Sequence, residues 1–184
     1  VLTDSDAFAS KKLVVCYVPD PFDARRFASR LINSMFTLRK KMLRGPRVLV
    51  VVDEAQEFIP DSHRKEDKTL ESNQAVERLL RQGRKYGLHG ILSSQRVAHL
   101  NVNAIQQIHT YFAGVLPRVY DRGVVAEAAG IPVEFLDEVT ELDVGEWLYT
   151  SHVATKIRGV PIFVKTPDNE EIIATEISST KNRV

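Results

Sequence analysis

The stretch that decides the fold is residues 47–56, RVLVVVDEAQ. Five consecutive apolar residues, mostly β-branched, run directly into an Asp-Glu pair at positions 53 and 54. An unbroken apolar run of this length predicts a strand that is buried on both faces, as central strands of parallel sheets are. Two carboxylates at its carboxyl end lie where α/β sheets place their ligand chemistry. The simpler interpretation is a buried strand whose polar end opens an ordinary loop.

An apolar strand that ends in Asp-Glu is also the Walker B pattern of nucleotide hydrolases. In this pattern Asp53 holds Mg²⁺ through water, and Glu54 prepares the water that attacks the γ-phosphate of ATP. Short motifs recur by chance, so these ten residues alone do not decide between a hydrolase site and an ordinary loop. The decision depends on the rest of the chain.

Composition sets the broad class of the protein. The chain has 184 residues, of which 43% are hydrophobic and 27% charged, enough for one domain with its own core. The net charge of +1 does not by itself point to nucleic acid. The single cysteine, Cys16, cannot form an internal disulfide, and no apolar run approaches the ~18 residues of a membrane span. We therefore expect a cytoplasmic protein with no membrane partner.

A strand–helix–strand pattern leads into the opening stretch. The apolar run at 13–18 predicts a second buried strand, which Pro19-Asp20-Pro21 stops. A long helix follows, and Gly45-Pro46 ends it. Strand, helix and strand make a βαβ unit, so the two strands should be parallel. The predicted inward face of the helix consists of Phe27, Leu31, Met35, Leu38 and Met42.

The same helix carries a run of positive charge. Eight basic residues and no acid lie between Asp23 and Asp53. They could form a phosphate-binding surface, or they could be the solvated face of an amphipathic helix whose last-turn cations complement the helix dipole. We favour the solvated face, because charge runs of this kind usually mark one. The eight residues are Arg25, Arg26, Arg30, Arg39, Lys40, Lys41, Arg44 and Arg47.

A second βαβ unit follows the Asp-Glu pair. A polar loop at 59–68 leads to a helix at 69–85, and an apolar strand at 90–94 then ends at Gln95-Arg96. This strand delivers polar side chains to the same edge of the sheet as Asp53 and Glu54.

The last third of the chain changes character. The pattern predicts a short helix capped by Asn101, a fourth strand, two small helices, and an antiparallel hairpin formed by 146–153 and 161–165. We expect an α/β fold in which residues 1–142 form the core and 143–184 form a β-hairpin extension with a polar tail.

Three stretches together resemble HerA-type ATPases, within the HerA/FtsK group of DNA-pumping P-loop motors. VVVDEAQEFIP at 50–60 resembles their Walker B segment. LRQGRKYG at 80–87 is similar to their Gly-Arg-Lys-aromatic-Gly helix end, and SSQR at 93–96 to their Ser/Thr-Gln-Arg strand end. LDVGE at 142–146 resembles the turn that closes their motor domain. The resemblance covers roughly residues 12–165, and the order and spacing of the motifs are more specific than any one of them.

The resemblance implies a RecA-like fold and a role for each site residue. Asp53 would hold Mg²⁺ through water, and Glu54 would polarise the attacking water. Gln95 would reach the γ-phosphate or that water. Arg84 matches the arginine finger that acts on the ATP of a neighbouring subunit, an effect worth about 10³–10⁵ in rate. The alternative for Arg84 is a cation at a helix C-terminus. Arg96 would help to bind nucleotide, or would hold Glu54 or a neighbouring carboxylate.

One feature of the family is missing. The chain contains no G-x-x-x-x-G-K-[ST], so it has neither the backbone nest nor the lysine that binds the β- and γ-phosphates. In the family this loop precedes the Walker B strand, so we expect the chain to be the carboxyl-terminal part of a motor domain that does not hydrolyse ATP alone. An apolar face of its sheet should then be uncovered and prone to self-association.

The resemblance implies a ring, expected to be a homo-hexamer, that uses ATP and Mg²⁺ to move double-stranded DNA. It also implies a partner nuclease, NurA-like in DNA end processing or another effector in defence. Two alternatives remain at this point. One is a catalytically inactive binding or assembly module that keeps the fold without the P-loop. The other is a conjugation- or packaging-type motor.

Overall fold

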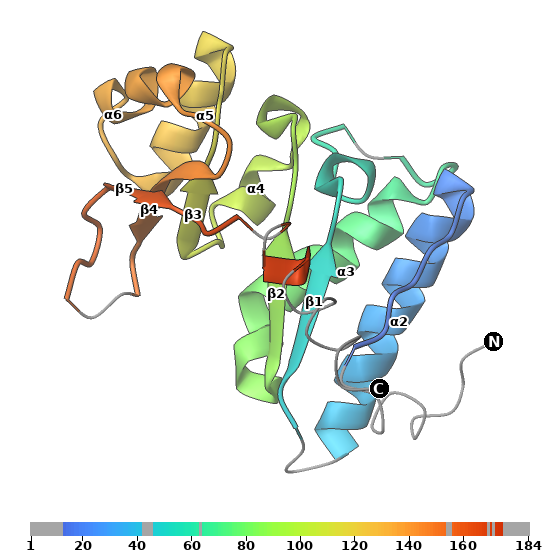
Figure 1. Cartoon of the computed structure of the whole chain (residues 1–184). Helices are drawn as coiled ribbons and strands as arrows, with labels where there is room; N and C mark the ends of the chain where they lie inside the picture. The colour runs from blue at the N-terminus through green and yellow to red at the C-terminus, as the bar shows by residue number, and fades with distance from the viewer. Residues whose placement is uncertain are drawn as a thin grey trace.

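The computed structural model describes residues 13–41, 46–62, 64–153, 156–168, 170 and 172–174. Its strands form two separate sheets, with the helices packed on them (Figure 1). The elements, in chain order, are α2 (Pro21–Lys41), β1 (Val48–Val52), η1 (Ala55–Glu57), α3 (Thr69–Gln82), η2 (Gly83–Tyr86), β2 (Leu88–Leu92), η3 (Val97–His99), α4 (Val102–Ile105), β3 (Thr110–Ala113), α5 (Val119–Ala129), α6 (Glu134–Asp137), η4 (Glu138–Glu141), β4 (Glu146–Ser151) and β5 (Ile162–Lys165).

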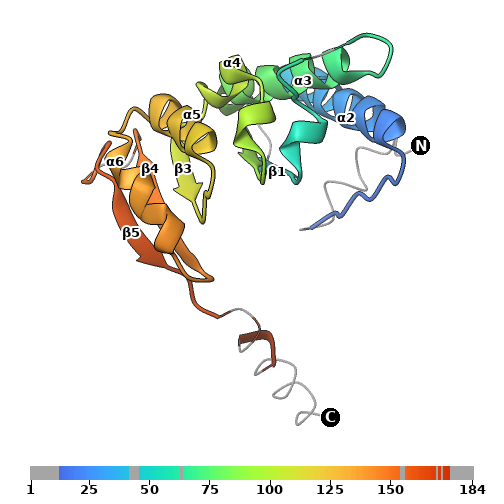
Figure 2. The same cartoon turned by 90° about the horizontal axis from the view of Figure 1, so that it is seen from above.

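The first sheet is the parallel pair β1–β2, in register from Val48 opposite Leu88 to Val52 opposite Leu92. The α3 helix connects the two strands, so the predicted second βαβ unit is confirmed. In Figure 2, α2 and α3 lie together on one side of this sheet. The core between the helices and the sheet includes Ile32, Phe36, Val76, Leu79 and Leu88.

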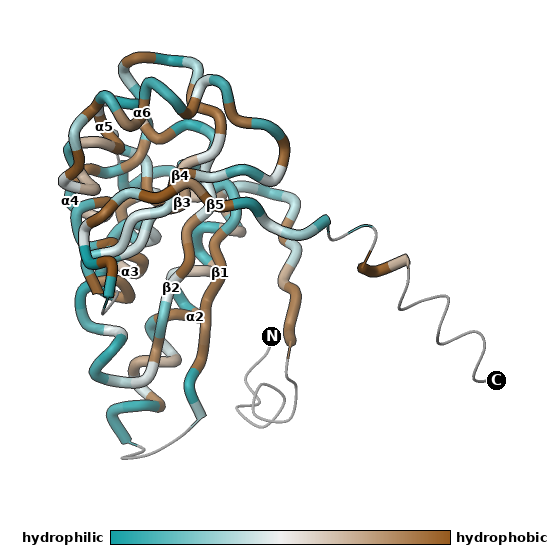
Figure 3. Tube along the Cα trace, turned by 60° about the vertical axis from the view of Figure 1, so that its left-hand side comes forward, coloured by the Kyte–Doolittle hydropathy of each residue, from teal (hydrophilic) through white to brown (hydrophobic). Residues whose placement is uncertain are grey.

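The other face of this sheet is uncovered. Leu49 is 56% exposed, Val51 62% and Ile91 49%. Figure 3 shows β1 as an almost continuous apolar segment. The prediction that this strand is buried on both faces is therefore wrong, because no described element packs on the second face. The expectation of an uncovered apolar face is confirmed.

The segment at 13–18 forms no strand. It is extended, as Figure 2 shows, and residues 13–17 are exposed. The predicted first βαβ unit is therefore absent from the described structure. A strand needs a hydrogen-bonding neighbour, and no described strand lies beside this segment.

The buried face of α2 also differs from the prediction. Ser29, Ile32 and Phe36 are buried, whereas Leu38 is exposed. The Phe36 ring packs edge-on against Tyr86, with ring centroids 5.4 Å apart. Spacings of three and four also connect 29, 32 and 36, so periodicity alone does not select the inward stripe. Met42 and Gly45, the predicted end of this helix, lie outside the described residues.

The second sheet is antiparallel, in the order β3–β4–β5. The predicted C-terminal hairpin is confirmed as β4 paired with β5. The fourth predicted strand forms as β3, and it pairs with β4 rather than with the parallel sheet. The pairing of β3 with β4 joins residues on both sides of the predicted domain boundary between 142 and 143. That boundary stays a prediction. One face packs on α5, α6 and η4 through a cluster that includes Ala113, Val125, Leu136, Val139 and Leu148.

The fold is thus of the α/β class: a parallel pair with helices on one face, followed by an antiparallel sheet with its own helical layer. Among the helices of the described residues, none is long and apolar enough to span a membrane.

Candidate active site

The carboxyl ends of β1 and β2 are joined beyond their last paired residues. The Ser93 backbone N–H donates to the Val52 carbonyl at 2.9 Å, and the Ala55 N–H donates to the Ser93 carbonyl at 2.8 Å. These two bonds hold the segment after β1 against the segment after β2. The Asp-Glu pair and the Ser-Gln pair at 94–95 are therefore neighbours, as the parallel arrangement predicts.

Glu54 is at the centre of this edge. Its backbone is left-handed, with φ 48° and ψ 51°, a conformation that costs a side-chain-bearing residue on the order of 1 kcal/mol. The Gln95 Nε2 donates to Glu54 Oε1 at 3.0 Å, and the Gln56 Nε2 donates to Oε2. Both oxygens of the carboxylate are thus held by neutral amides. The structure brings the two predicted residues Glu54 and Gln95 together.

Gln56 and Ser94 were missed as functional residues by sequence reasoning. The Ser94 hydroxyl donates to Gln56 Oε1 at 2.6 Å, and the Arg96 backbone N–H donates to Ser94 Oγ at 3.1 Å. Both residues lie inside the two motif stretches: Gln56 in η1, which follows β1, and Ser94 shortly after the end of β2. That placement was the available signal, but it did not show that the two side chains meet.

Asp53 is exposed at the same edge. Its Oδ1 accepts the Glu54 backbone N–H at 3.0 Å. A solvent-facing carboxylate fits the role of holding Mg²⁺ through water, because Mg²⁺ keeps several waters and takes few protein ligands besides nucleotide phosphates. No group of three or more His, Cys, Asp or Glu side chains that could hold a metal occurs among the described residues.

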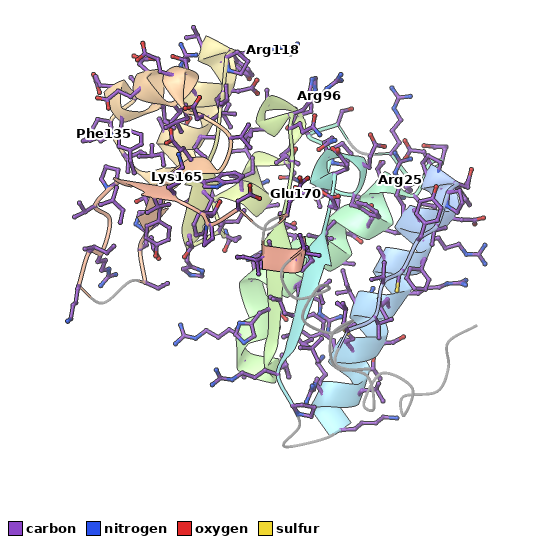
Figure 4. All side chains as sticks on the ribbon, viewed as in Figure 1. Arg25, Arg96, Arg118, Phe135, Lys165 and Glu170 are labelled. Atoms are coloured by element: carbon purple, nitrogen blue, oxygen red, sulfur yellow. The ribbon has the colours of Figure 1, made fainter. Side chains whose placement is uncertain are left out.

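Arg96 lies at the carboxyl end of β2 with an exposed side chain (Figure 4). In the described part of the chain this side chain forms no ion pair, and the side-chain bonds to the Glu54 oxygens come from the two glutamine amides. The structure therefore does not place Arg96 on Glu54. The side chain faces solvent, where it is available to a ligand.

Arg84 lies in η2, at the opposite end of β2 from Glu54. Five strand residues at about 3.3 Å each separate the two ends by roughly 15 Å. Within one chain, Arg84 therefore does not reach Glu54.

The motif needs a glycine at position 83, because an added Cβ there would lie 2.5 Å from the Leu88 carbonyl oxygen. The glycine lets η2 fold tightly against the start of β2.

One residue of the basic run, Arg25, has a structural role. Its Nε donates to the Glu57 carbonyl at 2.7 Å, and its guanidinium pairs with the Glu57 carboxylate at 3.1 Å. A third bond, 3.3 Å long, goes to the Asp67 carbonyl. Arg25, labelled in Figure 4, thus ties α2 to the segment after the Asp-Glu pair.

Asp67 itself lies in a local turn. The hydroxyl and the backbone N–H of Thr69 both donate to its carboxylate, which lowers the pKa of Asp67 from its ordinary value.

The other basic residues of α2 fit the interpretation of a solvated helix face. Exposed cations of this helix are Arg26, Arg30, Lys40 and Lys41.

The fold is of the α/β class, and it can be compared with solved structures. The genome packaging NTPase B204 of Sulfolobus turreted icosahedral virus 2, in complex with ATP-gammaS, matches with a TM-score of 0.65 and 20% identity, over 90% of this chain and 72% of that one. The AMPPCP complex of that protein has a TM-score of 0.62. The DNA-packaging ATPase B204 of Sulfolobus turreted icosahedral virus has a TM-score of 0.63 and 18% identity, over 92% and 73% of the chains.

Neither models of protein families nor characterised protein sequences match the chain. At 18–20% identity the structural likeness shows a shared fold. These proteins are packaging NTPases, one of the motor classes that the sequence left open, and the narrower HerA assignment stays a prediction.

Proposed function

We propose that this chain is part of a ring-forming, ATP-driven motor that moves double-stranded DNA, with Glu54 as the residue that activates the hydrolytic water. The observation that carries the proposal is the Glu54–Gln95 hydrogen bond of 3.0 Å. It joins a carboxylate and an amide at the carboxyl ends of two adjacent parallel strands. The shared fold with NTPases that are solved in complex with ATP analogues supports the same conclusion.

The side chains divide the work of hydrolysis. Glu54 takes a proton from the attacking water, as a general base. Gln95 orients that water or a γ-phosphate oxygen without adding charge, because its amide is neutral. Asp53 would hold Mg²⁺ through water, and a bound Mg²⁺ would neutralise charge on the phosphates. Arg96 faces solvent at the same edge and is available to nucleotide.

A phosphate-binding loop has to come from outside these 184 residues, since the sequence contains none. Two features of the structure support such a completion. In the part of the chain that is described, β2 pairs only with β1 and β3 only with β4, so each has an open edge. The uncovered apolar face of the parallel sheet includes Leu49 and Val51 of β1 and Ile91 of β2. We propose that a further strand and its helices fill these positions, and that the chain alone does not hydrolyse ATP.

Arg84 acts in this proposal on the nucleotide of a neighbouring subunit. It is exposed, and it lies too far from Glu54 to serve its own chain. A finger that acts between subunits requires a closed ring, and a homo-hexamer is the proposed form. Mixing Arg84→Ala subunits with phosphate-loop mutants should restore part of the ATP hydrolysis. An absence of rescue would count against this role.

The DNA substrate follows from the class of motor. Two settings are proposed for it in the cytoplasm: DNA end processing or defence together with a nuclease, NurA-like in the first case, and genome packaging. The packaging setting is favoured by the solved proteins that share the fold. An inactive assembly module remains the alternative from another functional class.

The test is Glu54→Gln in the protein that carries this chain together with a phosphate-binding loop. We expect DNA-stimulated ATP hydrolysis to fall by about 10²–10⁴-fold, because the general base is lost, while ATP binding is retained. Glu57→Gln is the matched control. Glu57 is a nearby glutamate whose carboxylate pairs with Arg25 and forms no bond with Gln95. Normal turnover in Glu54→Gln would overturn the proposed function.

A further inference from the structure

We propose that Gln56 is a positioning residue for Glu54, and that Ser94 sets the orientation of the Gln56 amide. Through these two side chains the end of β2 controls the direction of a carboxylate on the end of β1. This inference rests on the proposed function, in which Glu54 activates water. It concerns side chains that the hydrolytic mechanism does not otherwise use.

The hydrogen bonds form a chain with one direction. The Arg96 backbone N–H can only donate, so Ser94 Oγ accepts from it at 3.1 Å. The Gln56 Oε1 can only accept, so the Ser94 hydroxyl donates its proton there at 2.6 Å. The Gln56 NH₂ is then turned toward Glu54 Oε2, to which it donates. A flipped amide would set its oxygen against the carboxylate, so this network permits one orientation.

Glu54 needs such a support because of its backbone. The left-handed conformation of this residue, between the end of β1 and η1, means that no regular ladder or helix directs its side chain. The two amides of Gln56 and Gln95 fix the carboxylate instead. A carboxylate offers about four lone-pair positions, so two remain for the attacking water. Both amides are neutral, so they orient the carboxylate without adding a charge beside it.

The two glutamines differ in accessibility. Gln95 is exposed, whereas Gln56 and Ser94 are half-buried. Gln95 can therefore exchange its bond to Glu54 for a bond to nucleotide or water. The half-buried Gln56–Ser94 pair keeps its bond to Glu54 when Gln95 exchanges its own bond. We assign the permanent support to Gln56 and the ligand-responsive contact to Gln95.

The first experiment measures steady-state ATP hydrolysis by the complete ATP-hydrolysing protein. Gln56→Ala should lower kcat by about 10–100-fold, because a misplacement of about 1 Å at a reacting group costs up to 10² in rate. The nucleotide Kd, measured with a fluorescent ATP analogue, should change less than threefold, roughly the scatter expected of a residue that makes no ligand contact. Gln74→Ala, which removes an exposed glutamine of α3, is the matched control.

Two further variants separate positioning from a general structural role. Ser94→Ala should lower kcat by about tenfold, and Ser94→Thr should recover most of that loss, because it keeps the hydroxyl that orients Gln56. Gln56→Glu keeps the size of the side chain but sets a second carboxylate beside Glu54. It removes the NH₂ group that donates to Glu54 Oε2, as Gln56→Ala does, so kcat should fall by a similar factor while the nucleotide Kd changes less than threefold.

The outcomes distinguish the two proposals. If Glu54→Gln is inactive while Gln56→Ala and Ser94→Ala turn over normally, the positioning inference fails and the proposed function stands. If Glu54→Gln is active, the proposed function fails. Thermal unfolding of each variant shows whether it is folded, and a normal kcat in a folded Gln56→Glu would also overturn the inference.

Discussion

Each sheet of this molecule packs helices on one face and leaves apolar side chains exposed on the other, where Phe112 of the antiparallel sheet is 57% exposed. The antiparallel sheet buries Leu148, at 1% exposure, under α5, α6 and η4. The parallel sheet carries apolar side chains on both faces, and helices cover one of them, which leaves Leu49 56% exposed on the other. The candidate active site lies at the strand ends of the parallel sheet. Its geometry comes from backbone and side-chain hydrogen bonds at the strand ends, which do not require the second face to be packed.

The largest expected effect compares one leucine from each sheet. Leu148→Ala should lower the free energy of unfolding by about 2–5 kcal/mol, because it opens a cavity in a packed cluster. Leu49→Ala should lower it by less than about 0.5 kcal/mol, as is usual for a side chain at the surface. Urea unfolding of the two variants measures both values. An equal cost would break the comparison, since it would mean that Leu49 is covered in solution.

Two glycines test the packing at the ends of the elements. Gly83→Ala sets a Cβ 2.5 Å from the Leu88 carbonyl oxygen, which is backbone and cannot easily move. We expect a loss of about 1–3 kcal/mol, the usual cost of overpacking. Gly123→Ala, within α5, meets nothing within 4 Å and should stabilise the chain by about 0.5–1 kcal/mol. Thermal unfolding measures both changes, and the same sign for the two would refute this account of Gly83.

A further comparison concerns Tyr111, which packs against both hydrophobic clusters and so joins the two sheets. Its hydroxyl lies 3.0 Å from the Ile105 and Ala128 carbonyl oxygens and can donate to either. Tyr111→Phe should cost about 1 kcal/mol at neutral pH, the worth of one hydrogen bond. Urea unfolding at pH 7 measures this loss.

The same residue predicts a dependence on alkaline pH. Burial raises the pKa of Tyr111 from 10.0 to about 12. As pH rises from 10 to 12, the unfolded chain loses this proton before the folded chain does, so the folded state loses stability. The Tyr111→Phe variant lacks this contribution, and its stability should fall less steeply over that range. Parallel curves for the two proteins would show that Tyr111 is not buried.

Local patterns predicted much of the fold. The apolar run before Asp53 became β1, the helical period of 69–85 became α3 and η2, and the C-terminal hairpin formed as β4 and β5. Asn101 caps α4, as expected, by accepting the Asn103 backbone N–H at 2.9 Å. These predictions succeed because strand and helix periods and helix caps depend on residues close in sequence.

Predictions that depend on distant residues did less well. The segment at 13–18 reads as a strand but forms none, since a strand exists only with a partner. The second face of β1 reads as buried but is exposed, since burial requires a covering element. Gln56 and Ser94 meet at 2.6 Å although 38 positions apart in sequence, and no local pattern encodes that contact.

The sequence by itself determined an apolar strand that delivers Asp53 and Glu54, and a second strand that delivers Gln95, because pattern and polarity are properties of the chain. The tertiary structure decided that these ends lie side by side and that two glutamine amides hold Glu54 in a left-handed backbone. It also decided that Arg84 lies at the opposite end of β2 from Glu54. Distances between residues far apart in sequence are set only when the elements pack, so the sequence alone does not predict them.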